Sequence, residues 1–145
     1  MSRELEKKKL YVGCGLTFAS EKFKNDVEEL KTVLNRDWQV LEFLGLVAGT
    51  AADVYQRDIV VNVGSCDAFV AIADEPSIGL GYEICAASEV FRKPTLAVAQ
   101  VNSKVTRMLL GAAEVQPNML FIPYENMVRD VPIIVGETFA GVLER

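Results

Sequence analysis

The sequence predicts an α/β fold in which a five-stranded parallel sheet carries helices on both faces. Short apolar runs typical of buried parallel strands alternate with amphipathic segments typical of helices, and most connections are short. The 145 residues are enough for one domain with a substantial core, and 50% of them are hydrophobic. We therefore expect a single domain over residues 1–145, with residues 1–8 as a flexible N-terminus.

Strands and helices are expected to alternate along the whole chain. The apolar runs predict strands at residues 9–15, 38–43, 68–73, 94–99 and 119–124. The periodic segments between them predict helices at residues 21–35, 53–63, 84–91, 103–111 and 131–144. Residues 45–52 have a loop-like composition and are placed to cover a site. The alternation predicts right-handed crossovers between the parallel strands.

A glycine-rich stretch from Asp74 to Glu83 connects the third strand to the third helix. Within it, Gly79 and Gly81 let backbone amides approach an anion, and Ser77 adds a hydroxyl. Such a turn lies at the carboxyl end of a sheet, where open α/β folds bind ligands. The first strand also ends in glycines. A cleft is therefore expected between the first and third strands if they are adjacent.

Two acidic residues are candidates for a role in this cleft. Glu83 is expected in the first helical turn, where the helix dipole favours the ionised carboxylate, so it is a candidate nucleophile or ligand clamp. The alternative is an acid that only partners the dipole. Asp58 interrupts the apolar face formed by Val54 and Val61, which favours either a site role or a surface or capping role.

Composition excludes several classes of function. The net charge of -5 argues against a nucleic-acid-binding surface but not against a nucleotide ligand. No apolar run reaches the length of a membrane span, and residues 1–9 are charged and lack an apolar signal core, so we expect a cytoplasmic protein. The chain has no histidine, which excludes serine-histidine and cysteine-histidine catalysis. We expect no metal and no cofactor.

The chain resembles the nucleoside 2-deoxyribosyltransferase superfamily, most closely its 2'-deoxynucleoside 5'-phosphate N-hydrolase branch. The resemblance covers about residues 10–113 and is densest over residues 67–93. It rests on Tyr11 with Gly13 or Gly15, on Asp58 and Asp67, and on the segment Pro76-Ser77-Ile78-Gly79-Leu80-Gly81-Tyr82-Glu83. It implies a Rossmann-like (flavodoxin-like) domain that acts on a small nucleotide or nucleoside.

The resemblance also implies roles for individual residues. Glu83 is expected to attack the anomeric carbon of the sugar and form a covalent intermediate that water resolves. Asp58 is expected to position the sugar or base and assist proton transfer, and Tyr11 to orient the nucleophile. The expected phosphate ligands are Ser77, Gly79 and Gly81, with further contacts from Gly13, Gly15 and Thr17. A hydroxyl from a second subunit, matched by Thr106, is expected to complete the phosphate site in a homodimer.

Three functions follow from these expectations. The first is hydrolysis of the N-glycosidic bond of a (2'-deoxy)nucleoside 5'-monophosphate, and the second is transfer of deoxyribose between bases. The third is a nucleotide-binding module without catalysis. It is motivated by two departures from the family pattern: Phe43 replaces a histidine, and Leu16-Thr17-Phe18 replaces a basic residue for which Lys22 is the candidate substitute.

Overall fold

A computed structural model describes residues 6–44 and 48–145 of the chain. Its described strands form one sheet with the order β2-β1-β3-β4-β5, and every adjacent pair is parallel. The strands are β1 Lys9–Cys14, β2 Gln39–Leu41, β3 Ala68–Ile72, β4 Thr95–Gln100 and β5 Met119–Tyr124. The five-stranded parallel sheet predicted from the sequence is confirmed.

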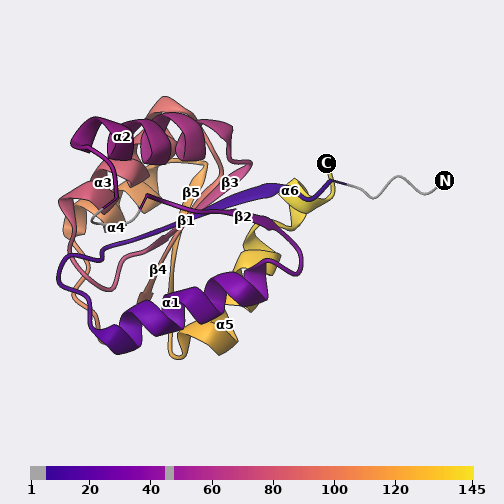
Figure 1. The fold of residues 1–145 in the computed structure, drawn as a ribbon. Coiled ribbons are helices and arrows are strands. Elements are labelled where there is room, and N and C mark those ends of the chain that lie inside the picture. Colours follow the sequence, from indigo (N-terminus) through magenta and orange to yellow (C-terminus); the bar gives the residue numbers. More distant parts are fainter. Residues whose placement is uncertain (1–5, 45–47) are drawn as a thin grey trace.

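Helices cover both faces of the sheet (Figure 1). One face packs against α1 Glu21–Leu34, α5 Met127–Thr138 and α6 Ala140–Leu143. The other face packs against α2 Ala51–Tyr55 with its extension η1 Gln56–Val63, α3 Ile78–Cys85 with its extension η2 Ala86–Val90, and α4 Arg107–Val115. Each face has its own cluster of buried apolar side chains, as expected for a parallel sheet buried on both sides.

The order of the strands creates a switch point between β1 and β3. The chain passes from β1 outward to β2 and then returns to β3 on the other side of β1, where Tyr11 pairs in register with Phe69. Because all strands are parallel, their carboxyl ends share one edge of the sheet. The first and third strands are thus adjacent, which is the condition that the sequence analysis set for a cleft, and open α/β folds bind ligands at such a switch point.

Three helices begin four or more residues away from the start predicted from the sequence. The reason is the same in each case, because a polar side chain caps the helix at a residue that the apolar periodicity did not mark. Ser77 caps α3, Thr106 caps α4 and Asn126 caps α5. As a result α3 begins at residue 78 rather than 84, α4 at 107 rather than 103, and α5 at 127 rather than 131.

Two helices widen to a π-helical pattern in their second halves. The Gly64 amide donates to the Ile59 carbonyl, and the Phe91 amide donates to the Ala86 carbonyl, five residues back in each case. The wider turn changes which side chains of η1 face the sheet: Ile59, Asn62 and Val63 are buried. The predicted inward face of Val54, Asp58 and Val61 is therefore wrong, and Val61 is exposed.

Two expectations fall partly on residues 1–5 and 45–47, which lie outside the described residues. In the described part of the expected N-terminal tail, Lys7 donates a 2.6 Å hydrogen bond to the Asn35 carbonyl. In the expected loop, residues 48–50 precede α2, which begins at Ala51 with Thr50 and Asp53 forming a capping box. The loop is thus two residues shorter than predicted at its end.

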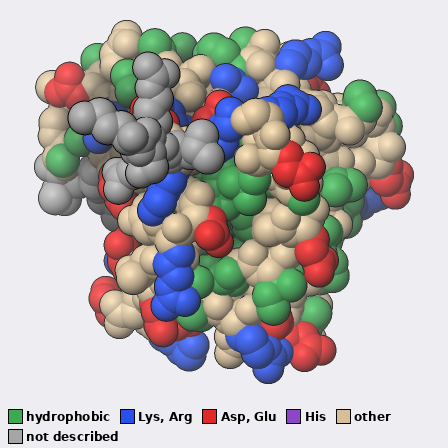
Figure 2. Space-filling model, turned by 90° about the vertical axis from the view of Figure 1, so that its right-hand side faces the viewer, with side chains coloured by type: hydrophobic (Ala, Val, Ile, Leu, Met, Phe, Trp, Pro, Cys, Tyr) green, Lys and Arg blue, Asp and Glu red, His purple; other side chains and the backbone are tan. Residues whose placement is uncertain are grey.

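Two features of the described residues bear on membranes and nucleic acids. No helix in residues 6–44 and 48–145 is long and apolar enough to cross a membrane. On the face shown in Figure 2, basic and acidic side chains are interspersed, and outside the grey atoms they form no continuous basic stripe. A stripe of that kind is the usual footprint of a nucleic-acid-binding surface.

Candidate active site

Two buried polar side chains meet beside the switch point. Tyr11 stands in the middle of β1 and is fully buried, while Glu83 reaches toward it from α3. The Tyr11 hydroxyl and the Glu83 Oε2 are both buried without a hydrogen-bond partner among the described residues. Buried polar atoms are nearly always paired, so two unpartnered atoms side by side indicate that the site is built for a ligand or a reaction.

Burial sets the protonation of Glu83. It raises the pKa of the Glu83 carboxyl to about 7; the Tyr11 hydroxyl lowers this pKa and the negative charge of Asp58 raises it. Burial, followed by the nearby Glu83 charge, also raises the pKa of Tyr11, which therefore stays protonated at neutral pH. A carboxyl group with a pKa near neutrality is typical of catalytic sites.

Asp58 lies on η1, close enough to Glu83 for its charge to change the pKa of the Glu83 carboxyl. It is half-buried, and its Oδ1 accepts a 3.0 Å hydrogen bond from the Leu44 amide. Burial raises the pKa of the Asp58 carboxyl, while the Leu44 amide and Arg57 lower it. The Asp58 charge raises the pKa values of both Glu83 and Tyr11, so the three side chains lie close enough to interact electrostatically.

The sequence analysis missed Asn62, which lies one turn after Asp58 on η1. Asn62 is only 2% exposed, and its Nδ2 donates a 2.8 Å hydrogen bond to the Glu42 carbonyl. Its amide lowers the pKa of Tyr11, so it lies beside the tyrosine hydroxyl. The spacing of four residues between Asp58 and Asn62 was the available signal, because it places both on one side of a helix.

The glycine-rich segment adopts a different geometry from the predicted turn. Ser77 caps α3 through a 3.2 Å hydrogen bond from the Leu80 amide to its Oγ, and the Gly81 amide donates to the Ser77 carbonyl. The Gly81 amide is therefore not free to bind an anion, contrary to the expectation. The amides of Ile78 and Gly79, at the first two helical positions, have no intrahelical acceptor and stay available.

Glu83 also lies one turn deeper in α3 than expected. The helix begins at Ile78, so Glu83 is its sixth residue and not a first-turn acid. The expectation that the helix dipole favours the ionised Glu83 carboxylate is therefore wrong, because the effect of the dipole is confined to the first turn. The ionisation of Glu83 is set by its burial and its neighbours instead.

The glycines after Tyr11 serve close packing. A Cβ at Gly13 would lie 3.1 Å from the Phe69 ring, and a Cβ at Gly15 would lie 2.8 Å from the Ser77 Cβ. Gly15 thus lets the first loop approach the helix cap, which brings the ends of β1 and β3 together. Thr17 lies in an exposed turn of the same loop.

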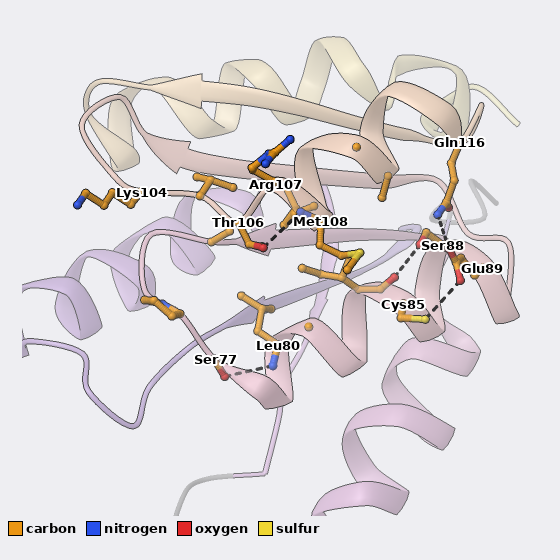
Figure 3. A pocket seen from close by; sticks show the side chains of 18 of the residues that line it. Ser77, Leu80, Cys85, Ser88, Glu89, Lys104, Thr106, Arg107, Met108 and Gln116 are labelled. Atoms are coloured by element: carbon orange, nitrogen blue, oxygen red, sulfur yellow. Dashed lines mark hydrogen bonds between the residues drawn. The ribbon is translucent and has the colours of Figure 1, made fainter.

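A groove of about 890 Å³ runs between α3 and α4 (Figure 3). Ser77 and Gly81 line it from α3, and Thr106 lines it from the start of α4, where its Oγ1 accepts a 3.3 Å hydrogen bond from the Met108 amide. Glu83 does not line this groove, because it faces Tyr11 and Asp58 on the other side of α3. The predicted phosphate ligands and the predicted nucleophile thus lie on two sides of one short helix.

Two residues taken from the resemblance lie away from these features. The Asp67 Oδ2 accepts a 2.7 Å hydrogen bond from the Lys9 amide, at the amino ends of the strands and hence at the opposite edge of the sheet. Lys22 is ion-paired with Asp26 at 2.7 Å and lines a cleft beside the start of α5. In residues 6–44 and 48–145, no cluster of three or more acidic or cysteine side chains is placed to hold a metal ion.

Comparisons with known proteins support the fold. No protein-family model matches the sequence, and no curated protein matches it. Among solved structures, the chain is similar to the CMP N-glycosidase BcmB of Clostridium botulinum, with a TM-score of 0.64 and 19% sequence identity. The similarity covers 86% of this chain and 98% of the other. At this identity it establishes the shared α/β fold.

Proposed function

We propose that the protein hydrolyses the N-glycosidic bond of (2'-deoxy)nucleoside 5'-monophosphates and releases a free base and a sugar 5-phosphate. The observation that carries this proposal is the buried Glu83 carboxylate beside the Tyr11 hydroxyl, in the middle of β1 and next to the switch point of the parallel sheet. A protein of similar fold is named a CMP N-glycosidase, which supports the same class of chemistry.

Glu83 is the proposed nucleophile. Its ionised carboxylate forms a bond to C1' of the sugar while the bond from C1' to the base nitrogen breaks, and the bonding electron pair leaves with the base. Water then adds to C1', the sugar–Glu83 ester bond breaks, and the carboxylate is regenerated. The developing positive charge on the sugar is stabilised by a carboxylate held in a buried site, where electrostatic interactions are strong.

Asp58, on η1, and Tyr11, on β1, are the proposed assisting residues. Burial raises the pKa of Asp58, which suits it to give a proton to the departing base and to take one from the attacking water. The Tyr11 hydroxyl is a donor with no other described partner and holds the ionised Glu83 in position. Because it lowers the pKa of Glu83, it also keeps more of the nucleophile ionised.

The start of α3 is the proposed phosphate site. Its free Ile78 and Gly79 amides, the Ser77 hydroxyl and the positive end of the helix dipole all favour an anion. A sugar that lies over Glu83 would direct its 5'-phosphate toward the carboxyl edge, where α3 begins. Lys104 and Arg107 line the neighbouring groove and add positive charge at its α4 side.

We further propose a homodimer in which a second copy covers the groove between α3 and α4. Exposed apolar side chains mark this face, among them Met108 at 81% and Val115 at 82% exposed. In Figure 3, Thr106 and Met108 project from the start of α4 into the space above α3. The Thr106 hydroxyl of one subunit would then reach the phosphate site of the other.

Sedimentation tests the dimer. The wild type should sediment as a dimer at micromolar concentration, and Met108→Glu should give monomers, because it places a charge in the buried contact. Thr32→Glu, on the exposed outer face of α1, is the control and should stay dimeric. A monomeric wild type would contradict the shared site.

Incubation with CMP and dCMP tests the activity. Release of free cytosine and sugar 5-phosphate is expected from the wild type, and no release is expected from Glu83→Gln. Addition of a second base separates hydrolysis from transfer, because a transferase would produce a new nucleotide. Binding of dCMP without any turnover would instead support a nucleotide-binding module.

A further inference from the structure

Two tyrosines connect the helices that carry the acidic residues. Tyr55 is the last residue of α2, and Tyr82 lies in α3 directly before Glu83. Their ring centroids are 6.3 Å apart and the ring planes are inclined by 77°. The two helices thus contact each other through an aromatic pair beside the proposed catalytic groups.

The position of this pair follows from the direction of the helices. Both α2 and α3 begin at the carboxyl edge of the sheet and run away from it, so Tyr55 lies one turn nearer to that edge than Asp58. Tyr82 is likewise nearer to the edge than the deeper residues of α3. The aromatic pair therefore lies nearer to the carboxyl edge of the sheet than Asp58 on one helix, and next to Glu83 on the other.

The pair is poorly explained as packing alone. Tyr55 is 48% exposed and Tyr82 is 59% exposed, and neither belongs to the core cluster on this face of the sheet. In an edge-to-face pair, at least one ring face is free to receive a third flat ring. Exposed aromatic rings beside a few polar side chains are typical of sites that bind a planar apolar group.

We propose that Tyr55 and Tyr82 form the stacking site for the nucleobase, the leaving group of the proposed reaction. This inference rests on the proposed function, because it assigns the base to a place beside Asp58 and Glu83. Stacking on an aromatic side chain accepts any base, since every base has a π-face. The site would therefore provide affinity for the aromatic group without selecting one base, and a sugar phosphate that lacks a base would not use it.

Binding by stacking has a definite kinetic consequence. The rings contact the base both before and during bond cleavage, so their removal weakens substrate and transition state alike. Loss of one ring should raise KM roughly tenfold and leave kcat nearly unchanged, whereas loss of Glu83 removes kcat. This difference separates a stacking residue from a catalytic residue.

Calorimetric titration of four variants tests the inference. Tyr55→Ala and Tyr82→Ala, each combined with Glu83→Gln so that the nucleotide survives, should bind dCMP roughly tenfold more weakly than the Glu83→Gln parent. Both should bind 2-deoxyribose 5-phosphate as tightly as the parent does. Tyr55→Phe and Tyr82→Phe should retain the affinity for dCMP, because the ring remains.

Phe91→Ala is the matched control. Phe91 is also a partly exposed aromatic residue, and its ring lies close to Gly64, so it connects the far ends of the same two helices. Its removal should not change the affinity for dCMP. Circular dichroism would show that every variant is folded.

Several results would overturn the stacking site. Unchanged affinity for dCMP in both alanine variants would do so, and so would an equal loss for dCMP and for the sugar phosphate. A change of sedimentation without a change of affinity would assign the tyrosines to a subunit contact. A wild type that does not bind dCMP also rejects the site. If the wild type binds dCMP but cleaves nothing, and the alanine variants weaken only dCMP, the stacking site stands while the proposed hydrolysis fails.

Discussion

Replacement of Tyr11 by phenylalanine should make the protein more stable and less active. The Tyr11 hydroxyl is fully buried and makes no hydrogen bond of standard length and angle, although Glu83 and Asn62 lie close enough to change its pKa; such a poorly paired group costs about 1–3 kcal/mol. Tyr11→Phe removes the hydroxyl and keeps the ring that packs against Phe69 at 5.5 Å between centroids. For a chain of this length, a gain of that size raises Tm by about 3–9 °C.

The same change should move the pH dependence of catalysis. The proposed reaction needs ionised Glu83, so kcat/KM should rise with pH through the pKa of this carboxyl, which is about 7. The Tyr11 hydroxyl lowers this pKa, and its loss should therefore shift the rising limb to higher pH, by about one unit for each 1.4 kcal/mol of lost interaction. At pH 6 the variant should consequently be much slower than the wild type.

Thermal unfolding and a pH–rate profile together provide the assay. The gain in Tm should be largest near pH 5, where Glu83 is protonated, and smaller above pH 7, where the hydroxyl stabilises the ionised carboxylate. A lower Tm for Tyr11→Phe at pH 5 would refute the claim that the hydroxyl is unsatisfied. A rising limb at the wild-type position would refute the claim that Tyr11 acts on Glu83.

Three further substitutions test other parts of the site. Glu83→Gln should abolish turnover while dCMP affinity stays within about tenfold in titrations. The wild type should lose stability as the pH rises from about 5 to 8, because a folded pKa of about 7 makes the folded state bind more protons than the unfolded state in that range, and Glu83→Gln should remove this loss. Asp58→Asn should slow turnover about 10²-fold or more while the rising limb moves to lower pH, since the Asp58 charge raises the pKa of Glu83; an unshifted limb in the rate profile would argue against their coupling. Gly15→Ala should weaken phosphate binding and lower Tm in titration and melting experiments, because its Cβ would lie 2.8 Å from the Ser77 Cβ; a fully tolerated alanine would show that the loop moves freely.

The sheet was predictable because its signals are local. Each strand is a short apolar run bounded by turn residues, and alternation with helices permits few topologies, but the adjacency of β1 and β3 stayed a condition that only the structure met. Helix starts were less predictable, since Ser77, Thr106 and Asn126 are ordinary polar residues until the backbone places them as caps. Their effect on the site was large, because the start of α3 decides which glycine amides are free.

The candidate site was predictable only where a residue type is chemically conspicuous. Glu83 and Asp58 were candidates from the residues themselves and Tyr11 only from the family resemblance, and the structure brings the three side chains close together. Asn62 was missed although it lies four residues after Asp58, and the pair of Tyr55 and Tyr82 was missed because two exposed tyrosines on different helices give no periodic signal. In the structure Asn62 is buried on η1 and lies beside Tyr11.

The features that suit this site to chemistry are also those that cost folding free energy. The Glu83 Oε2 and the Tyr11 hydroxyl are buried without a hydrogen bond of standard geometry among the described residues. The helices that carry Glu83 and Asp58 also contain π-helical segments, which are rare in proteins. The Tyr11 hydroxyl and the Glu83 carboxyl add nothing to the packing of the core, although η1 and η2 bury apolar side chains in it. Phenylalanine at position 11 and glutamine at position 83 would each relieve the cost of these groups by a single substitution. Their joint presence beside the switch point of the sheet therefore supports the proposed catalysis.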